Sequence, residues 1–200
     1  MENITVTDTK QLKLAPTEHD VHPLIRQRFS ARAFSAHPIT NAEMLTLFEA
    51  AAWAPSSMNE QPWRYRYALR GTPAFDELWN CLMPGNQPWT KQAAALVVSS
   101  GIKVLAQDGS PNHAWMHDVG LANANLLTQA VSMDLFGHIM GGIDRAKANT
   151  LLSIDEAREG IICFMAFGYL GSADLLEEPF KTRELTPRKR RPRAETMTAL

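Results

Sequence analysis

Two short stretches near the start of the chain carry side chains whose types and spacing suit ligand binding. In residues 28–34, the side chains of Arg28, Ser30 and Arg32 occupy alternate positions. An extended backbone points alternate side chains the same way, and two guanidinium groups with a hydroxyl suit a phosphate group. The pattern favours an anion site. The alternative is a solvated basic loop, which is commoner for such a pattern taken alone.

The second stretch, residues 54–63, is rich in hydroxyl and amide groups. Pro55 and Pro62 exclude a helix interior, because proline lacks an N–H group and restricts the residue before it. The two serines, the asparagine and the glutamine between these prolines offer more hydrogen-bonding capacity than a turn needs. A plain polar turn is the alternative interpretation.

A helix is expected to join these two stretches. Thr40 and Glu43 form a capping-box pattern, the apolar side chains that follow repeat at helical spacing, and Pro55 ends the pattern. A shorter helix is expected to begin at Pro23, directly before the two arginines.

Strands and helices follow along the rest of the chain. We expect strands over residues 64–70, 93–99 and 161–169. We expect helices over residues 73–82, 112–133 and 145–152. Gly137 is expected to end the second of these helices, and Asp144 is expected to cap the third.

The chain is expected to form one domain with two arms. Residues 1–17 carry no hydrophobic period and predict a flexible N-terminal arm. Residues 18–200 predict a single domain, with an extended C-terminal arm from about residue 175. This arm is basic and leaves three hypotheses open: nucleic-acid binding or a nuclear signal through Arg188–Arg191, a solvated tail, or a return to the anion site of Arg28 and Arg32.

Composition narrows the class of protein. The chain has 200 residues, 45% hydrophobic content and a net charge of −1, so its bulk charge favours neither nucleic acid nor an anionic membrane as a partner. Cys81 and Cys163 are far apart, which favours two packed thiols in a reducing compartment. The longest apolar run, residues 161–170, is too short for a membrane span, and the N-terminus lacks a signal-peptide pattern. We expect a cytoplasmic protein.

Other motifs carry less weight. The chain lacks a glycine-rich dinucleotide fingerprint, a P-loop and a G-x-S-x-G nucleophile pattern. His113 and His117 lie four residues apart and Asp118 follows, but a metal site is not favoured without a third ligand. His138 is expected to be packed or hydrogen-bonded beside the glycines that follow it.

Taken together, the motifs resemble those of the FMN-dependent nitroreductase family. The resemblance lies in the stretch from Arg28 to Phe34, the capped helix, and the stretch from Ala52 to Trp63, with further likeness in residues 117–122, 138–144 and 189–192. It covers nearly all of residues 20–195. It implies an α+β, nitroreductase-like fold with a central, mostly antiparallel sheet flanked by helices. It also implies an intertwined homodimer that binds one FMN per subunit at the interface.

The resemblance implies roles for individual residues. One set would take the phosphate, ribityl and pyrimidine parts of the flavin: Arg28, Ser30 and Arg32. A second set would lie under or beside the ring near N5: Asn86, Met140, Gly141 and Gly142. Two residues of the tail would close on the phosphate: Lys189 and Arg191. The other subunit would contribute a further set: Pro55, Ser56, Ser57, Asn59 and Gln61.

The implied activity is that of an oxidoreductase. Hydride would pass from NAD(P)H to N5 of FMN and then, by a ping-pong mechanism, to a small acceptor such as a nitroaromatic, a quinone or an enal. No side-chain acid or base and no metal is implied. Ile143 and Trp89 depart from the family's usual residues, which leaves the sub-family, the acceptor and the nicotinamide preference open. The alternative is a flavin-binding carrier or sensor that does not turn over with nicotinamide.

Overall fold

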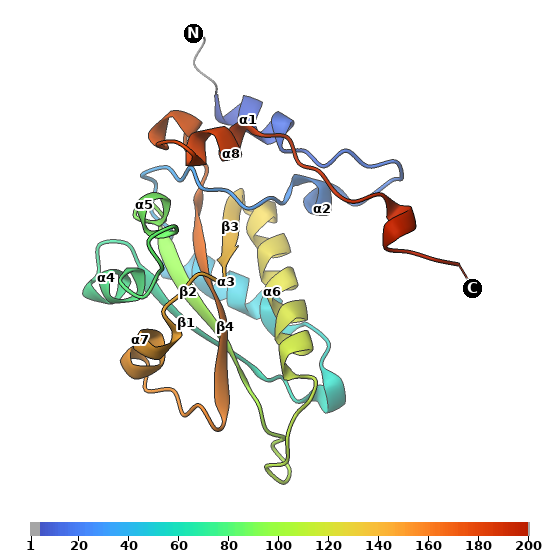
Figure 1. Ribbon diagram of the computed structural model, residues 1–200, viewed down its shortest axis with the longest axis vertical. Helices are drawn as coiled ribbons and strands as arrows, with labels where there is room; N and C mark the ends of the chain where they lie inside the picture. The colour runs from blue at the N-terminus through green and yellow to red at the C-terminus, as the bar shows by residue number, and fades with distance from the viewer. Residues whose placement is uncertain (1–4, 200) are drawn as a thin grey trace.

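The computed structural model describes residues 5–199 and has an α+β fold built on a four-stranded sheet (Figure 1). The strands follow the spatial order β1-β2-β4-β3, and each neighbouring pair is antiparallel. Their bounds are β1 (Trp63–Leu69), β2 (Ala95–Ile102), β3 (Leu135–Met140) and β4 (Glu159–Tyr169). The expected central antiparallel sheet flanked by helices is confirmed.

Helices surround this sheet. The α-helices are α1 (Val6–Leu12), α2 (Pro23–Gln27), α3 (Asn41–Ala52), α4 (Pro73–Trp79), α5 (Gln87–Thr90), α6 (Trp115–Ser132), α7 (Arg145–Leu151) and α8 (Phe180–Leu185). Short 3₁₀ turns are η1 (Ser57–Asn59), η2 (Ala173–Leu175) and η3 (Arg193–Glu195). The expected positions of α2, α3, α4, α6 and α7 are confirmed, including the capping box of Thr40 and Glu43 and the Asp144 cap.

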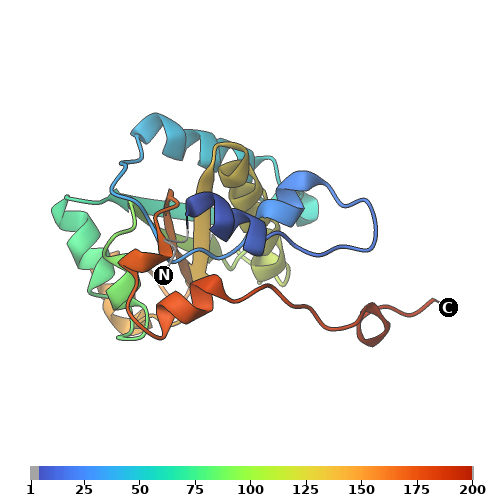
Figure 2. The same ribbon diagram turned by 90° about the horizontal axis from the view of Figure 1, so that it is seen from above.

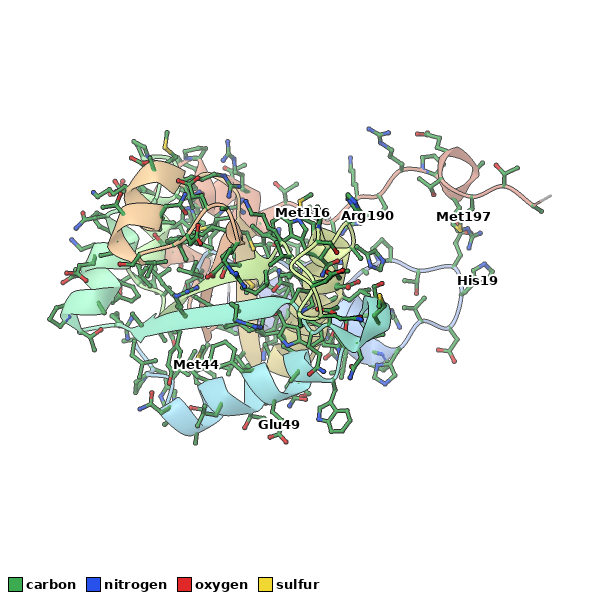
Figure 3. All side chains as sticks on the ribbon, turned by 90° about the horizontal axis from the view of Figure 1, so that it is seen from below. His19, Met44, Glu49, Met116, Arg190 and Met197 are labelled. Atoms are coloured by element: carbon green, nitrogen blue, oxygen red, sulfur yellow. The ribbon has the colours of Figure 1, made fainter. Side chains whose placement is uncertain are left out.

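The helices form a layer on each face of the sheet. Val97 of β2 belongs to the apolar cluster that includes α3 and α6, whereas its neighbour Val98 belongs to the cluster that includes α4 and α7. Side chains of a strand alternate between its faces, so the two central strands are buried on both sides. Met44 of α3 lies on the sheet side of its helix, and Glu49 points away (Figure 3).

Strand β3 differs from the expectation that Gly137 ends the long helix. Helix α6 already ends at Ser132, and Asp134 turns the chain with a φ of 58°. Gly137 lies inside β3, where a Cβ atom would come within 2.4 Å of the side chains of Leu127 and Phe167. Glycine is needed here because helix α6 and the neighbouring strand approach the backbone closely, and not because a helix stops.

Both ends of the described chain contain helix where we expected irregular structure. Residues 5–17 include α1, which begins at a capping box of Thr5 and Asp8; residues 1–4 lie outside the described part. Prolines in the tail predict an extended path, but α8 follows Pro179, because proline is tolerated where backbone N–H groups have no helical partner. Beyond α8 the chain is extended as far as η3, and it projects away from the sheet (Figure 2).

Two sequence-based expectations about the core and the membrane can be compared with the structure. Cys81 and Cys163 are both buried free thiols, as expected. Among residues 5–199, the helices are too short or too polar to cross a membrane.

Candidate functional site

Residues 28–34 form an extended segment, called here the arginine strip, which crosses one end of the sheet. Phe29, Ala31 and Ala33 are buried, and Arg28, Ser30 and Arg32 face outward. The Phe29 ring packs on Phe136 of β3 with a centroid separation of 5.0 Å. The predicted alternation is therefore confirmed: the strip places two guanidinium groups and a hydroxyl on the same side.

His138 of β3 is hydrogen-bonded to the backbone of the strip. Its Nδ1 lies 2.9 Å from the carbonyl oxygen of Ala31, and its ring packs on Trp89 with a centroid separation of 4.5 Å. Burial, with a further effect from the charge of Arg32, lowers the pKa of His138 to about 4. The imidazole is therefore neutral near pH 7 and donates from Nδ1 to the strip. The expectation of a packed, hydrogen-bonded histidine is confirmed.

The guanidinium groups of Arg28 and Arg32 form no ion pair among the described residues, although the buried Glu184 accepts from the backbone of the strip and its charge opposes the lowering of the Arg32 pKa by burial. Within residues 5–199, no acidic side chain lies at ion-pair distance from Arg28 or Arg32. Burial lowers the pKa of Arg28, and the charge of Arg190 lowers it further. Arg188 is similarly affected by burial and by its two arginine neighbours. Half-buried cations that repel one another make this surface complementary to an anion.

The basic tail passes the strip within the same chain. Arg188 donates through Nη1 to the carbonyl oxygen of Arg26 at 2.8 Å, which anchors the tail beside α2. Lys189 lines a cavity of about 300 Å³ together with Arg28. Arg191 lies further along, in an adjoining cavity of about 660 Å³ that also includes His19. Figure 3 labels Arg190 on the tail and His19 on the segment between α1 and α2.

Gly141 and Gly142, the glycine pair that follows β3, expose backbone on one side. A Cβ atom at Gly141 would meet no other atom within 4 Å, so its backbone is open on that side. The carbonyl oxygen of Gly142 accepts a hydrogen bond from Asn86 Nδ2 at 3.0 Å, and a Cβ atom at Gly142 would come within 2.8 Å of that nitrogen. Met140 is buried in the core, so only its backbone is available to a ligand.

The second stretch is a strained and highly hydrogen-bonded loop. Met58, Asn59 and Gln61 have positive φ angles of 53°, 57° and 48°. Each such residue costs on the order of 1 kcal/mol, and such strain persists only where surrounding contacts fix it. Here Ser56 Oγ accepts from the backbone N–H of Gln61 at 3.0 Å. The exposed side chains of Asn59 and Gln61 are thus held at the surface by a constrained backbone.

Asp118 fixes this loop to α6, a role that we did not anticipate from the sequence. Its carboxylate accepts from the backbone N–H of Ser57 and from His117 Nδ1, both at 2.9 Å, and it is almost fully buried. The sequence placed it next to a histidine pair, which suggested a possible metal ligand. Residues 5–199 contain no cluster of acidic, histidine and cysteine side chains able to hold a metal.

The two stretches lie at opposite ends of α6 in one chain (Figure 1). The loop contacts the first turn of this helix through Asp118, and the strip packs on Phe136, just beyond its last turn. An 18-residue helix is about 27 Å long. One chain therefore places Lys189 beside the strip and Asn86 beside the glycine pair, and it leaves the loop of residues 55–61 at the far end of α6.

These features define an α+β protein with a cationic strip suited to a phosphate-bearing ligand, and known proteins share its fold. The sequence pattern of the Nitroreductase family matches residues 25–80 and 68–169. A crystal structure described as an oxidoreductase containing FMN is 32% identical with a TM-score of 0.86, over 92% of this chain and 93% of that one. The chain therefore belongs to the nitroreductase family.

Two further known proteins are similar to this chain and carry related names. A protein from Desulfovibrio desulfuricans, provisionally named a nitroreductase and solved in complex with FMN, is 25% identical with a TM-score of 0.70. That similarity covers 92% of this chain and 98% of the other. A curated protein from Archaeoglobus fulgidus, provisionally named NADH dehydrogenase/NAD(P)H nitroreductase, is 29% identical over 138 residues, which are 66% of this chain and 76% of that protein.

Proposed function

We propose that this chain is an FMN-dependent oxidoreductase that transfers hydride from NAD(P)H to a small electron acceptor, such as a nitroaromatic, a quinone or an enal. The observation that carries this proposal is the arginine strip, which presents Arg28, Ser30 and Arg32 on one side, with neither guanidinium group in an ion pair among the described residues. The family membership and the FMN-containing relatives support it.

The residues present fit a flavin mononucleotide. A phosphate held without a glycine-rich loop needs cationic side chains, and Arg28 and Lys189 line one cavity that can supply them. A planar ring needs backbone without side-chain bulk beneath it, and the open side of Gly141 offers that. In this proposal, Ser30 and Arg32 contact the ribityl chain and the pyrimidine, and Asn86 fixes the glycine pair through its bond to Gly142.

The protein's own contribution is positioning and charge. When bound, FMN supplies the chemistry of accepting hydride from one substrate and giving it to another. Arg32 stabilises negative charge near the pyrimidine, and His138 holds the Ala31 carbonyl that precedes it. No side chain is assigned as acid or base. One binding cleft would admit the two substrates in turn, so a ping-pong mechanism is expected, with parallel double-reciprocal lines when both concentrations are varied.

We further propose that the site is completed by a second copy of the chain. The strip and the loop of residues 55–61 are separated by the length of α6, so a single ligand can touch both only if two chains contribute. Exposed apolar side chains near the loop support an interface: Trp53 is 81% exposed, Met58 is 71% exposed and Met116 is 61% exposed.

Stopped-flow reduction tests this function. FMN-loaded protein is mixed with NADH or NADPH without oxygen, and flavin absorbance is followed. Bleaching within a turnover time, followed by recovery when menadione is added, is expected for the enzyme. A flavin that stays oxidised with both nicotinamides would contradict the proposal and favour a carrier or sensor.

A further inference from the structure

Glu184 of α8 is a fully buried carboxylate, and its side chain is hydrogen-bonded to the arginine strip. Its side chain is 0% exposed. Both carboxylate oxygens accept from the backbone N–H of Arg32 at 3.1 Å, and Oε1 also accepts from the N–H of Ala33 at 3.4 Å. Burying a carboxylate is costly unless its oxygens are satisfied, and in the described chain those two peptide groups satisfy it.

The helix that carries Glu184 is itself held in place. Lys13 donates through Nζ to the carbonyl oxygens of Arg183 at 2.9 Å and Thr186 at 2.7 Å, on either side of Glu184. The last carbonyl groups of a helix have no partner within the helix, so this lysine, only 8% exposed, satisfies two acceptors at the end of α8. Helices α1 and α8 lie side by side above the strip (Figure 1).

Two elements, β3 and α8, therefore hydrogen-bond to adjacent backbone groups of the strip. His138 of β3 bonds the Ala31 carbonyl oxygen, and Glu184 of α8 bonds the next two N–H groups, those of Arg32 and Ala33. Together these bonds define the path of the backbone from which the Arg32 side chain projects.

We propose that Glu184 is a positioning residue for the anion-binding strip: it sets the backbone at Arg32 so that this side chain meets the ligand. This inference rests on the proposed function, since the ligand is taken to be FMN. It assigns to the tail a role in addition to the cations at Lys189 and Arg191.

The direction of the change in ligand affinity distinguishes a positioning role of Glu184 from a simple effect of its charge. Glu184 is a negative group beside a cationic strip, so charge alone would make its neutralisation favour an anionic ligand. Positioning predicts the opposite, because glutamine has one acceptor oxygen and places an NH₂ group against backbone donors. The substitution Glu184→Gln thus changes ligand affinity in opposite directions under the two explanations.

The test is a titration of the full-length, FMN-free chain with FMN, followed by flavin fluorescence. We expect Glu184→Gln to raise the Kd about tenfold or more, the size expected for a lost charge-assisted bond. The matched control is Glu49→Gln, which removes the same charge from an exposed side chain of α3 that points away from the sheet, and it should leave the Kd unchanged. In an Arg32→Ala background, Glu184→Gln should weaken binding less than about threefold, because the two residues act through one contact.

Unchanged or tighter FMN binding by Glu184→Gln would overturn the proposal. So would an equal loss of affinity with and without Arg32, which would indicate a general effect on the fold. If the variant does not fold, amide hydrogen exchange in the wild-type chain decides: the N–H groups of Arg32 and Ala33 should be strongly protected, and exchange at the rate of an unfolded chain would overturn the assignment. A wild-type chain that binds no FMN would contradict the proposed function instead, and the exchange measurement would still test the role of Glu184.

Discussion

At the scale of single residues, the cations of the strip should determine FMN affinity. Arg28→Ala removes a charge-assisted contact to phosphate, so we expect a loss of about 1.5–3 kcal/mol in binding, or roughly ten- to a hundredfold in Kd. Fluorescence titration measures this change. Arg158→Ala, at an exposed arginine before β4, is the control and should bind FMN normally. Equal affinities for the two variants would place Arg28 outside the site.

His138 should make the protein sensitive to acid. Its pKa is lowered from 6.5 to about 4 in the folded chain, so between these values the unfolded chain binds a proton that the folded chain does not. The stability that it contributes is fully present above pH 6.5 and is lost as the pH falls through about 4. The loss is on the order of 3 kcal/mol.

Urea unfolding between pH 7 and pH 4 measures this loss. His138→Gln, which cannot titrate, should lose correspondingly less stability over that range. An imidazole whose NMR signals titrate near pH 6.5 in the folded protein would contradict the lowered pKa.

The residue types of the site could be predicted from the sequence, but the acidic side chains that hydrogen-bond to the backbone of the two stretches could not. The alternation of Arg28, Ser30 and Arg32 follows from local sequence, because an extended segment needs only a period of two. Asp118 and Glu184 bond backbone groups 61 and 152 residues away along the chain. Their partners depend on the completed fold, so a buried acidic residue in either helix gave no local sign of what it would bond.

At the scale of elements, helices with clear caps and hydrophobic periods were predicted from the sequence, whereas β3 and α8 were not. Strand β3 contains Gly137 and His138, which weaken a strand pattern, and it forms because β4 pairs with it and α6 covers it. Helix α8 has six residues and follows a proline, so Lys13 and the contacts of Glu184, rather than its own propensity, account for it.

The tail as an element should be needed for cofactor retention. Deleting all residues after Asp174 removes α8, Glu184 and the cations beside Arg28, so we expect FMN to be lost and the dimer to be weakened. The double substitution Lys189→Ala/Arg191→Ala leaves α8 in place and should weaken FMN binding while the dimer persists. Light scattering and the flavin content of the purified proteins measure both effects. A truncated protein that remains a yellow dimer would show that the tail is dispensable.

At the scale of the whole molecule, the central claim is that each FMN site uses the strip of one chain and the loop of another. The strip and the loop cannot meet within one chain, because α6 separates them. The resemblance of the sequence motifs to the nitroreductase family predicts this arrangement, and the positions of Asp118 and Phe136 at the two ends of one helix support it. A dimer with mixed defects can therefore reveal which chain supplies which half.

The most direct measurement uses a heterodimer of Arg28→Ala and Asn59→Ala chains, purified with two different tags after each homodimer has been shown to bind FMN weakly. If a site takes its strip from one chain and its loop from the other, one site of the heterodimer carries both defects and the other carries none. FMN titration should then show one site of wild-type affinity per heterodimer. A heterodimer in which both sites are weakened would mean that strip and loop act within the same chain, and it would contradict the claim.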